Sequence, residues 1–212
     1  MIPSVEYAFG RYDIVPGIAI GSRGAVGSVS LYLSRPLEDV RRVALDTSSR
    51  TSVALVKVLL RERLGRDPEY VPMAPALDDM LAVADAALLI GDPALEQRDA
   101  VTSLDVGEEW TRLTGLPFVY AFWAGPAGVV TRAGVARLRA ALDEGLDAFP
   151  EIAAKYANGA PGRAAVYLSY LRTNVVYRLG DEEVAGLREF YRRAHDLDLV
   201  PGNPELSFHA DQ

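Results

Sequence analysis

The chain has 212 residues, of which 50% are hydrophobic and 24% charged, and its 22 Lys and Arg against 29 Asp and Glu give a formal net charge of -7. This composition is typical of a folded globular protein and excludes disordered, collagenous and low-complexity classes. The absence of cysteine excludes disulfides, thiolate nucleophiles, iron–sulfur clusters and cysteine zinc sites. The acidic balance argues against a nucleic-acid partner.

The amino-terminal residues 1–6 contain no basic segment followed by an apolar run, so the sequence predicts no secretory signal and a cytoplasmic protein. The longest uncharged stretch, residues 113–131, approaches the length of a membrane span. Five glycines and prolines interrupt it and would leave backbone groups unsatisfied in lipid. We therefore interpret it as a buried strand between turns, and expect no membrane partner.

The first predicted elements are two extended segments, residues 14–20 and 28–33, separated by a turn with three spaced glycines. The pattern predicts a β-hairpin. The glycines do not match the dinucleotide-binding fingerprint, and no phosphate-loop motif occurs in the chain. The segment is thus interpreted as structural.

The next part of the chain alternates between strands and helices. Short apolar runs predict strands at 43–45, 70–73 and 86–90, and apolar residues at helical spacing predict helices at 53–63 and 77–83. Such alternation is typical of an α/β lobe.

The remainder is mostly helical. A helix at 104–113 and a strand at 118–123 precede a series of predicted helices, at 132–148, 151–157, 163–176 and 181–196, and a loop from 201 to 212. Because these helices follow the α/β block, we expect the chain to return from one lobe and pack on another.

The most informative motif is a run of hydroxyl side chains between the strand at 43–45 and the helix that follows it. It consists of Thr47, Ser48, Ser49, Arg50, Thr51 and Ser52, preceded by Asp46. Unpaired N–H groups at a helix start bind carboxylate or phosphate, and hydroxyls and arginine add donors. One interpretation is therefore an anion site. The other is that one serine caps the helix and the remaining hydroxyls are solvated.

Two further candidates are Gly91-Asp92 and Ser4. Gly91 and Asp92 follow a buried strand, at the edge where ligands of open α/β sheets usually bind. Asp92 could orient a substrate hydroxyl or act in proton transfer, or it could be a turn aspartate that caps the peptide after Pro93. Ser4 is interpreted as a helix cap.

His195 and His209 are far apart in sequence, form no metal pair or triad, and are expected to be exposed, so we predict no metal site.

Three segments together resemble a known family. They are DTSSRTSVAL from residue 46, LLIGDPAL from residue 88, and the region from GEEW at residue 107 to LPFVYAFWAG at residues 116–125. In order and spacing they resemble the chorismate dehydratases of the futalosine route to menaquinone, over essentially the whole chain.

This resemblance implies an α/β, two-lobed periplasmic-binding-protein-like fold of type II, with lobe I formed by residues 1–32 and 119–212 and lobe II by 33–118. It implies removal of water from chorismate to give 3-[(1-carboxyvinyl)oxy]benzoate, with no metal or organic cofactor. By the same resemblance, Ser4, residues 47–52 and Gly91 bind the substrate, and Asp92 is the catalytic residue.

Members of the family also resemble one another in an additional amino-terminal stretch, which carries an asparagine motif with no equivalent in these 212 residues. We therefore expect lobe I to be incomplete at its amino terminus.

The second functional hypothesis is a non-catalytic solute-binding protein for a small carboxylate, since proteins with this fold bind ligands more often than they catalyse reactions. The oligomeric state is left open.

Overall fold

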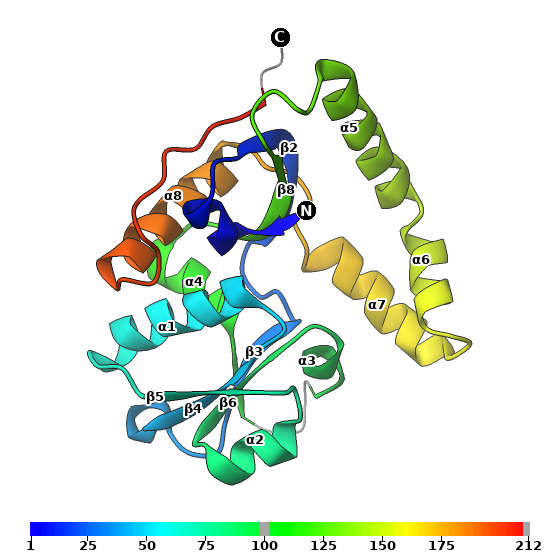
Figure 1. Ribbon diagram of the computed structural model, residues 1–212. Helices are drawn as coiled ribbons and strands as arrows, with labels where there is room; N and C mark the ends of the chain where they lie inside the picture. The colour runs from blue at the N-terminus through cyan, green and yellow to red at the C-terminus, as the bar shows by residue number, and fades with distance from the viewer. Residues whose placement is uncertain (98–101, 210–212) are drawn as a thin grey trace.

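The computed structural model describes residues 1–97 and 102–209 and contains two separate sheets (Figure 1). The smaller sheet has the strand order β1-β8-β2 and is antiparallel. The larger has the order β5-β4-β6-β3-β7 and combines parallel and antiparallel pairs. The α/β class expected from the sequence is confirmed.

The strands are β1 (Ile2–Pro3), β2 (Asp13–Ser22), β3 (Val29–Leu33), β4 (Arg42–Asp46), β5 (Glu69–Met73), β6 (Ala86–Ile90), β7 (Ser103–Asp105) and β8 (Phe118–Gly125). The helices are α1 (Arg50–Leu64), α2 (Leu77–Val83), α3 (Asp92–Glu96), α4 (Val106–Thr114), α5 (Arg132–Asp147), α6 (Phe149–Tyr156), α7 (Pro161–Thr173) and α8 (Asp181–Asp196). Two short 3₁₀ helices, η1 (Ser4–Phe9) and η2 (Leu37–Asp39), complete the set.

The larger sheet is covered on both faces, which explains why its strands are continuous apolar runs in the sequence. Leu45 and Leu88 point to the face that carries α1 and α4, and Ala87 and Leu89 point to the face that carries α2 and α3. Alternation of side chains along a strand produces this division.

Helix α1 starts at an N-cap, Ser49, whose hydroxyl accepts a hydrogen bond from the Ser52 N–H. It ends at Gly65, which has a φ of 66° and whose N–H donates to the Arg61 carbonyl. A left-handed residue after the last turn favours glycine because it has no Cβ. Eight of the fifteen helix residues are buried, so α1 lies in the core.

The hairpin predicted for residues 14–33 is wrong. β2 pairs with β8 in the smaller sheet, while β3 pairs with β6 and β7 in the larger one. The glycine-rich segment therefore carries the chain from one sheet to the other. Both strands were correctly located, but period-2 patterning does not specify the partner of a strand. Since β3 begins at Val29, the proposed lobe boundary at residue 33 falls inside a strand of the larger sheet.

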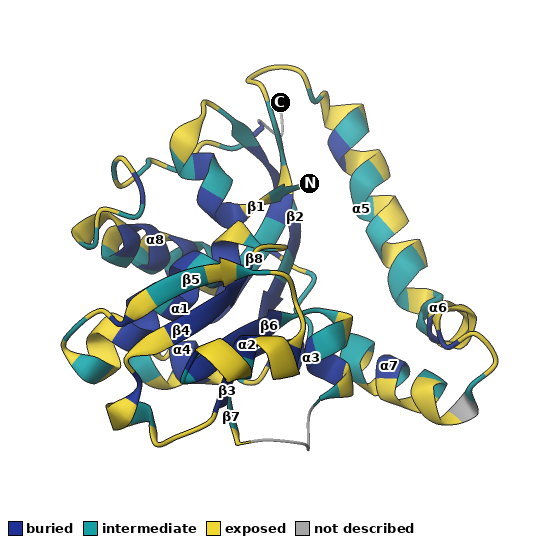
Figure 2. Cartoon of the chain, turned by 60° about the horizontal axis from the view of Figure 1, so that its bottom comes forward, coloured by how far each residue is buried: buried dark blue, intermediate teal, exposed yellow. Residues whose placement is uncertain are grey.

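The carboxyl-terminal helices divide into two groups. Helix α8 packs on β8, and its buried Phe190 and Tyr191 belong to the same apolar cluster as Leu55 of α1. Helices α5, α6 and α7 form an arm on one side of the molecule that is mostly exposed (Figure 2). Val135 is the buried residue of α5, and it packs against Val15 and Ile18 of β2.

Two smaller expectations concern histidines and the membrane. His195 is exposed as predicted, but His209 is 3% exposed, because residues 207–209 pair with Ile14 beside β2. The expected exposure of His209 is therefore wrong. Within the two described ranges, no helix combines the length and apolarity that crossing a membrane requires.

Candidate active site at the start of helix α1

The two polar loops singled out in the sequence lie at one edge of the larger sheet. β4 and β6 are parallel neighbours, with Leu45 opposite Leu88, so the residues that follow them emerge side by side. Residues 47–49 lead from β4 into α1, and Gly91 leads from β6 into α3. Topology thus brings together the hydroxyl run and the Gly91-Asp92 pair, which are about 40 residues apart in the chain.

Asp46 holds the two loops together. Its side chain is fully buried, and its carboxylate accepts hydrogen bonds from the Ser48 N–H at 2.8 Å and from the Ile90 N–H at 3.1 Å. A carboxylate that accepts two backbone donors forms strong hydrogen bonds. Asp46 is therefore the residue that fixes the β4–α1 loop relative to the end of β6.

The hydroxyls of the run have different environments. Thr47 and Ser48 are exposed and Ser49 is partly buried, whereas Thr51 and Ser52 are 1% exposed. The Thr51 hydroxyl oxygen accepts from the Val5 N–H at 3.2 Å, and Ser49 donates to the Ser52 hydroxyl oxygen at 3.1 Å. Only part of the run thus faces solvent. Substrate binding by these residues stays a prediction, whereas a cap is present at Ser49.

Arg50 faces solvent but has partners. Its guanidinium forms an ion pair with Glu6 and lies over the Phe9 ring, 5.5 Å from the centroid. Both partners belong to η1, next to the smaller sheet. Arg50 therefore joins the two sheets beside the start of α1, and a ligand carboxylate would compete with Glu6 for it.

Gly91 and Asp92 follow β6, which is the neighbour of β4 on the side opposite to β5. Gly91 has a φ of 74° and is the N-cap residue of α3, so Asp92 does not cap the turn, contrary to one of its two interpretations. The exposed Asp92 carboxylate accepts a hydrogen bond from Tyr156 of α6 at 3.0 Å. This hydrogen bond raises the pKa of the Tyr156 hydroxyl, because it stabilises the protonated phenol.

A second tyrosine of the arm lies nearby. The Tyr170 hydroxyl of α7 is 3.0 Å from the Ser28 hydroxyl, and the Ser28 carbonyl accepts from the Gly91 N–H at 2.7 Å. Burial raises the pKa of Tyr170, so the phenol is neutral at physiological pH and can donate a hydrogen bond. The arm thus contacts the Gly91-Asp92 side of the site through two phenols.

Ser4 does not face these loops. Its side chain is fully buried and its hydroxyl donates to the Val119 carbonyl at 2.7 Å, while its own carbonyl accepts from Tyr191 at 2.6 Å. The N-cap of η1 is Pro3, and no side chain caps this helix, so the helix-cap interpretation of Ser4 is wrong. A substrate contact by Ser4 stays a prediction.

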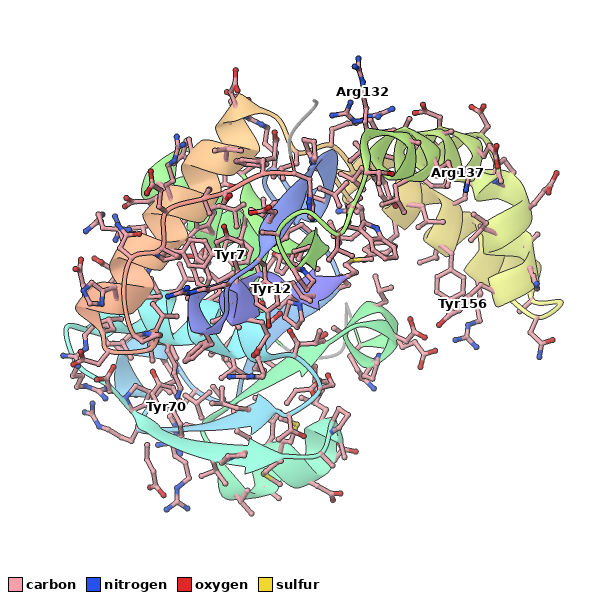
Figure 3. The ribbon with its side chains drawn as sticks, turned by 45° about the horizontal axis from the view of Figure 1, so that its top comes forward. Tyr7, Tyr12, Tyr70, Arg132, Arg137 and Tyr156 are labelled. Carbon is pink, nitrogen blue, oxygen red and sulfur yellow. The ribbon has the colours of Figure 1, made fainter. Side chains whose placement is uncertain are left out.

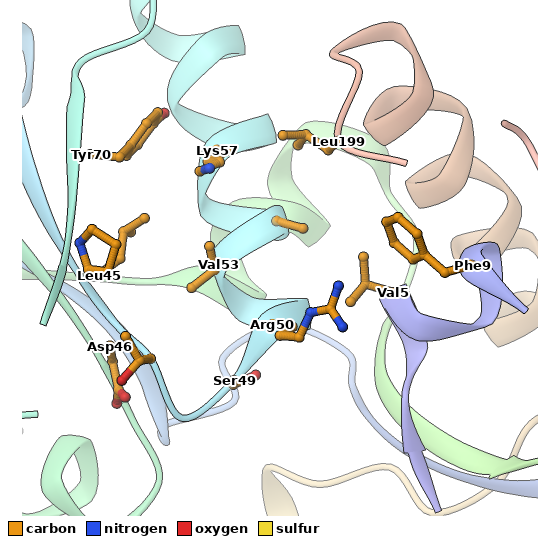
Figure 4. A pocket seen from close by; sticks show the side chains of 13 residues that line it. Val5, Phe9, Leu45, Asp46, Ser49, Arg50, Val53, Lys57, Tyr70 and Leu199 are labelled. Atoms are coloured by element: carbon orange, nitrogen blue, oxygen red, sulfur yellow. The ribbon is translucent and has the colours of Figure 1, made fainter. Parts of the chain in front are cut away.

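A pocket of about 390 Å³ begins at the hydroxyl run and continues along α1 on the side of β5 (Figure 4). We call it the α1-flank pocket. Its lining residues come from η1, β4, the β4–α1 loop, α1, β5 and the segment after α8: Val5, Phe9, Leu45, Asp46, Thr47, Ser49, Arg50, Val53, Ala54, Lys57, Tyr70, Pro72 and Leu199. Asp92 and Tyr156 are not among them; Figure 3 shows Tyr156 and Tyr70 on different sides of the molecule.

Sequence reasoning missed several of these residues. Asp46 was noted only as the start of the polar run. Lys57 is seven positions after Arg50, a helical spacing that places both on one face and that could have indicated their shared pocket. Tyr156 and Tyr170 are brought near the loops by long-range packing of the arm, for which the sequence contains no local signal.

Comparison with known proteins shows the family to which the chain belongs. Residues 1–196 match the family model VitK2_biosynth, described as menaquinone biosynthesis. Over 196 residues the chain is 33% identical to the chorismate dehydratase of Thermus thermophilus, an alignment that covers 84% of this chain and 71% of that protein.

Solved structures share the fold. Protein AF1704 from Archaeoglobus fulgidus superposes with a TM-score of 0.65 at 23% identity, covering 94% of this chain and 78% of its own. An ABC transporter protein from Parabacteroides distasonis gives 0.62 at 15%, covering 100% and 80%. The periplasmic aliphatic sulphonate binding protein SsuA from Escherichia coli gives 0.57 at 16%, covering 99% and 75%. The chain has a two-lobed periplasmic-binding-protein-like fold of type II, and it belongs to the menaquinone biosynthesis family.

Proposed function

We propose that the chain is a chorismate dehydratase, a lyase that removes water from chorismate to give 3-[(1-carboxyvinyl)oxy]benzoate. The observation that supports this most strongly is the 33% identity over 196 residues to a chorismate dehydratase. Two of the three motifs of the sequence resemblance, the hydroxyl run and the Gly91-Asp92 turn, lie at the candidate site. The third contains α4, which packs against α1 and β8.

The proposed reaction breaks one C–H bond and one C–O bond at two neighbouring carbons of the cyclohexadiene ring, and the ring itself stays intact. A ring carbon loses its proton to a base, the neighbouring carbon loses its hydroxyl group, and the electron pair of the C–H bond completes the aromatic ring. The hydroxyl leaves as water after it gains a proton. No electron is transferred to an acceptor, so the step needs no oxidant, and aromatisation supplies the driving force.

The protein's contribution is binding, orientation and proton transfer. The exposed hydroxyls of Thr47 and Ser48, the partly buried hydroxyl of Ser49 and the first N–H groups of α1 are the proposed partners of one carboxylate. Asp92 is the proposed base, since it is a carboxylate in contact with the Tyr156 phenol at the same sheet edge. Gly91 binds through its backbone, where it has no side chain to obstruct the substrate.

The proposal extends to the futalosine route and to a cytoplasmic location, both of which follow from the resemblance to the biosynthetic enzymes. A receptor function is not favoured. The ABC transporter protein and the sulphonate binding protein are only 15% and 16% identical to this chain, so their similarity shows the fold alone.

The test is to incubate the purified chain with chorismate and to follow the ultraviolet change that accompanies aromatisation. We expect turnover in the wild type, a loss of at least about tenfold in kcat/KM for Ser49→Ala, and a larger loss for Asp92→Asn. Asp78→Asn, an exposed aspartate in the first turn of α2, is the matched control and should keep full activity. Binding of chorismate without any spectral change in the wild type would instead support a receptor.

A further inference from the structure

The α1-flank pocket is lined by two cationic side chains and by one carboxylate, that of Asp46, which accepts hydrogen bonds from two backbone N–H groups. Two positively charged side chains, Arg50 and Lys57, line it together with the apolar side chains of Val53, Phe9 and Leu199. Such a combination is suited to a molecule with an apolar body and more than one negative charge.

Lys57 differs from the other cations around the site. Arg50 is paired with Glu6, whereas Lys57 forms no ion pair within the described part of the chain. The ammonium nitrogen of Lys57 lies 4.9 Å from the centroid of the Tyr70 ring. The chain has only one other lysine, Lys155, on α6. A partly buried ammonium without a carboxylate partner gains most from an anionic ligand.

Tyr70 lines the same end of the pocket through its ring. Its hydroxyl oxygen is buried and has no hydrogen-bond partner in the described structure. Burial is also the main cause that raises the pKa of Tyr70, so the phenol keeps its proton and can donate it to an acceptor. The charged groups that act on this hydroxyl are Asp67 and Arg61, which do not line the pocket, so Tyr70 contributes its ring to the pocket.

The spacing of the two cations suits a ligand with two separated carboxylates. Arg50 and Lys57 are two helical turns apart, about 10 Å along the axis, and on nearly the same face of α1. The partly buried Ser49 is at the Arg50 end of the pocket and Tyr70 is at the Lys57 end (Figure 4).

We infer that Lys57 is a specificity-determining residue that binds the second carboxylate of a dianion whose first carboxylate lies at the hydroxyl run and the start of α1. Because Asp92 does not line this pocket, the dianion in this position is bound beside the proposed base and not in contact with it. This inference rests on the proposed function, since chorismate and its dehydration product each carry two carboxylates. The α1-flank pocket therefore selects dianions over monoanions of similar size.

The test is calorimetric titration with two unreactive ligands. One is 3-[(1-carboxyvinyl)oxy]benzoate, which has both carboxylates, and the other is 3-ethoxybenzoate, which lacks the second. For Lys57→Met we expect the Kd for the dianion to rise about tenfold or more and the Kd for the monoanion to stay unchanged, because only one charge-assisted interaction is removed. Lys57→Arg should restore most of the affinity, and Lys155→Met, on the exposed face of α6, is the matched control.

The outcomes separate this inference from the proposed function. Equal affinity of wild type and Lys57→Met for the dianion, equal weakening for both ligands, or no binding of the dianion to the wild type would overturn the role of Lys57. Turnover of chorismate with an unchanged KM in Lys57→Met would also overturn it and leave the function intact. Selective loss of dianion binding in a chain that does not turn over chorismate would support Lys57 and reject the dehydratase.

Discussion

Helix α1 and helix α5 have nearly the same length and the same kind of start, but they are held in the molecule very differently. Each begins at a hydroxyl N-cap, Ser49 or Thr131, that accepts a hydrogen bond from a backbone N–H of the first turn. Eight of fifteen residues are buried in α1, against one of sixteen in α5. Local signals thus specify that a helix forms, while packing decides how firmly it is fixed.

This difference also separates the two sides of the candidate site. The hydroxyl run is attached to a helix in the core and fixed by the buried Asp46. Asp92 is exposed, and its described side-chain partner is a phenol on the exposed arm. We expect the carboxylate-binding side to be rigid and the proton-transfer side to be mobile, because segments with few buried contacts open at low free-energy cost.

The largest expected effect comes from core truncation in the two helices. Leu55→Ala in α1 removes a fully buried side chain and should lower the free energy of unfolding by about 3 kcal/mol. Leu138→Ala in α5 removes a partly buried one and should cost less than about 1.5 kcal/mol. Urea denaturation followed by circular dichroism measures both. Equal losses would mean that the arm is as well packed as α1.

The next effect compares the two aspartates of the site. Asp46→Ala leaves the N–H groups of Ser48 and Ile90 without their acceptor and should cost about 2 kcal/mol. Asp92→Ala removes an exposed carboxylate and should leave the melting temperature almost unchanged while abolishing turnover. Thermal unfolding and the chorismate assay on the same preparations give both readouts. A stable Asp46→Ala variant would contradict the anchoring role of Asp46.

The smallest effect is a pH dependence on α8, which packs beside α1. Hydrogen bonds from Arg192, and then from Arg193, lower the pKa of Glu189 from 4.5 to about 2. Because the pKa is lower in the folded state, the stabilisation is complete above pH 4.5 and is lost as the pH falls toward 2. Solvent screening limits it to less than about 1 kcal/mol. Glu189→Gln should flatten the dependence of the free energy of unfolding on pH between 2 and 4.5. An unchanged dependence would contradict the stabilising role of the hydrogen bonds from Arg192 and Arg193 to Glu189.

The predictable parts of the fold are those with strong periodic patterns. The bounds of α2 and β6 agree with the sequence expectation to the residue, because a turn or a glycine follows each apolar run. The helix expected at 104–113 begins at Val106 instead, since Leu104 belongs to β7. Asp105 is the N-cap of this helix, and its carboxylate accepts a hydrogen bond from the Glu108 N–H.

Pairing was not predictable to the same degree. The strands 14–20 and 28–33 are adjacent in sequence yet lie in different sheets, and nothing in their alternation indicates this. In the site, the loops were found because residue type and position relative to a strand are local signals. The contacts of Asp92 with Tyr156 and of Ser28 with Tyr170 span 64 and 142 positions, and such contacts arise only from tertiary packing.

The position of Lys57 has a practical consequence for chemical labelling. Because the chain has two lysines, an amine-selective reagent can modify only two side chains, one in the α1-flank pocket and one on the arm. The exposed Lys155 provides an internal reference for reagent concentration. The ratio of the two labelled peptides in a mass spectrum therefore reports occupancy of the pocket directly, with any small molecule and without an activity assay.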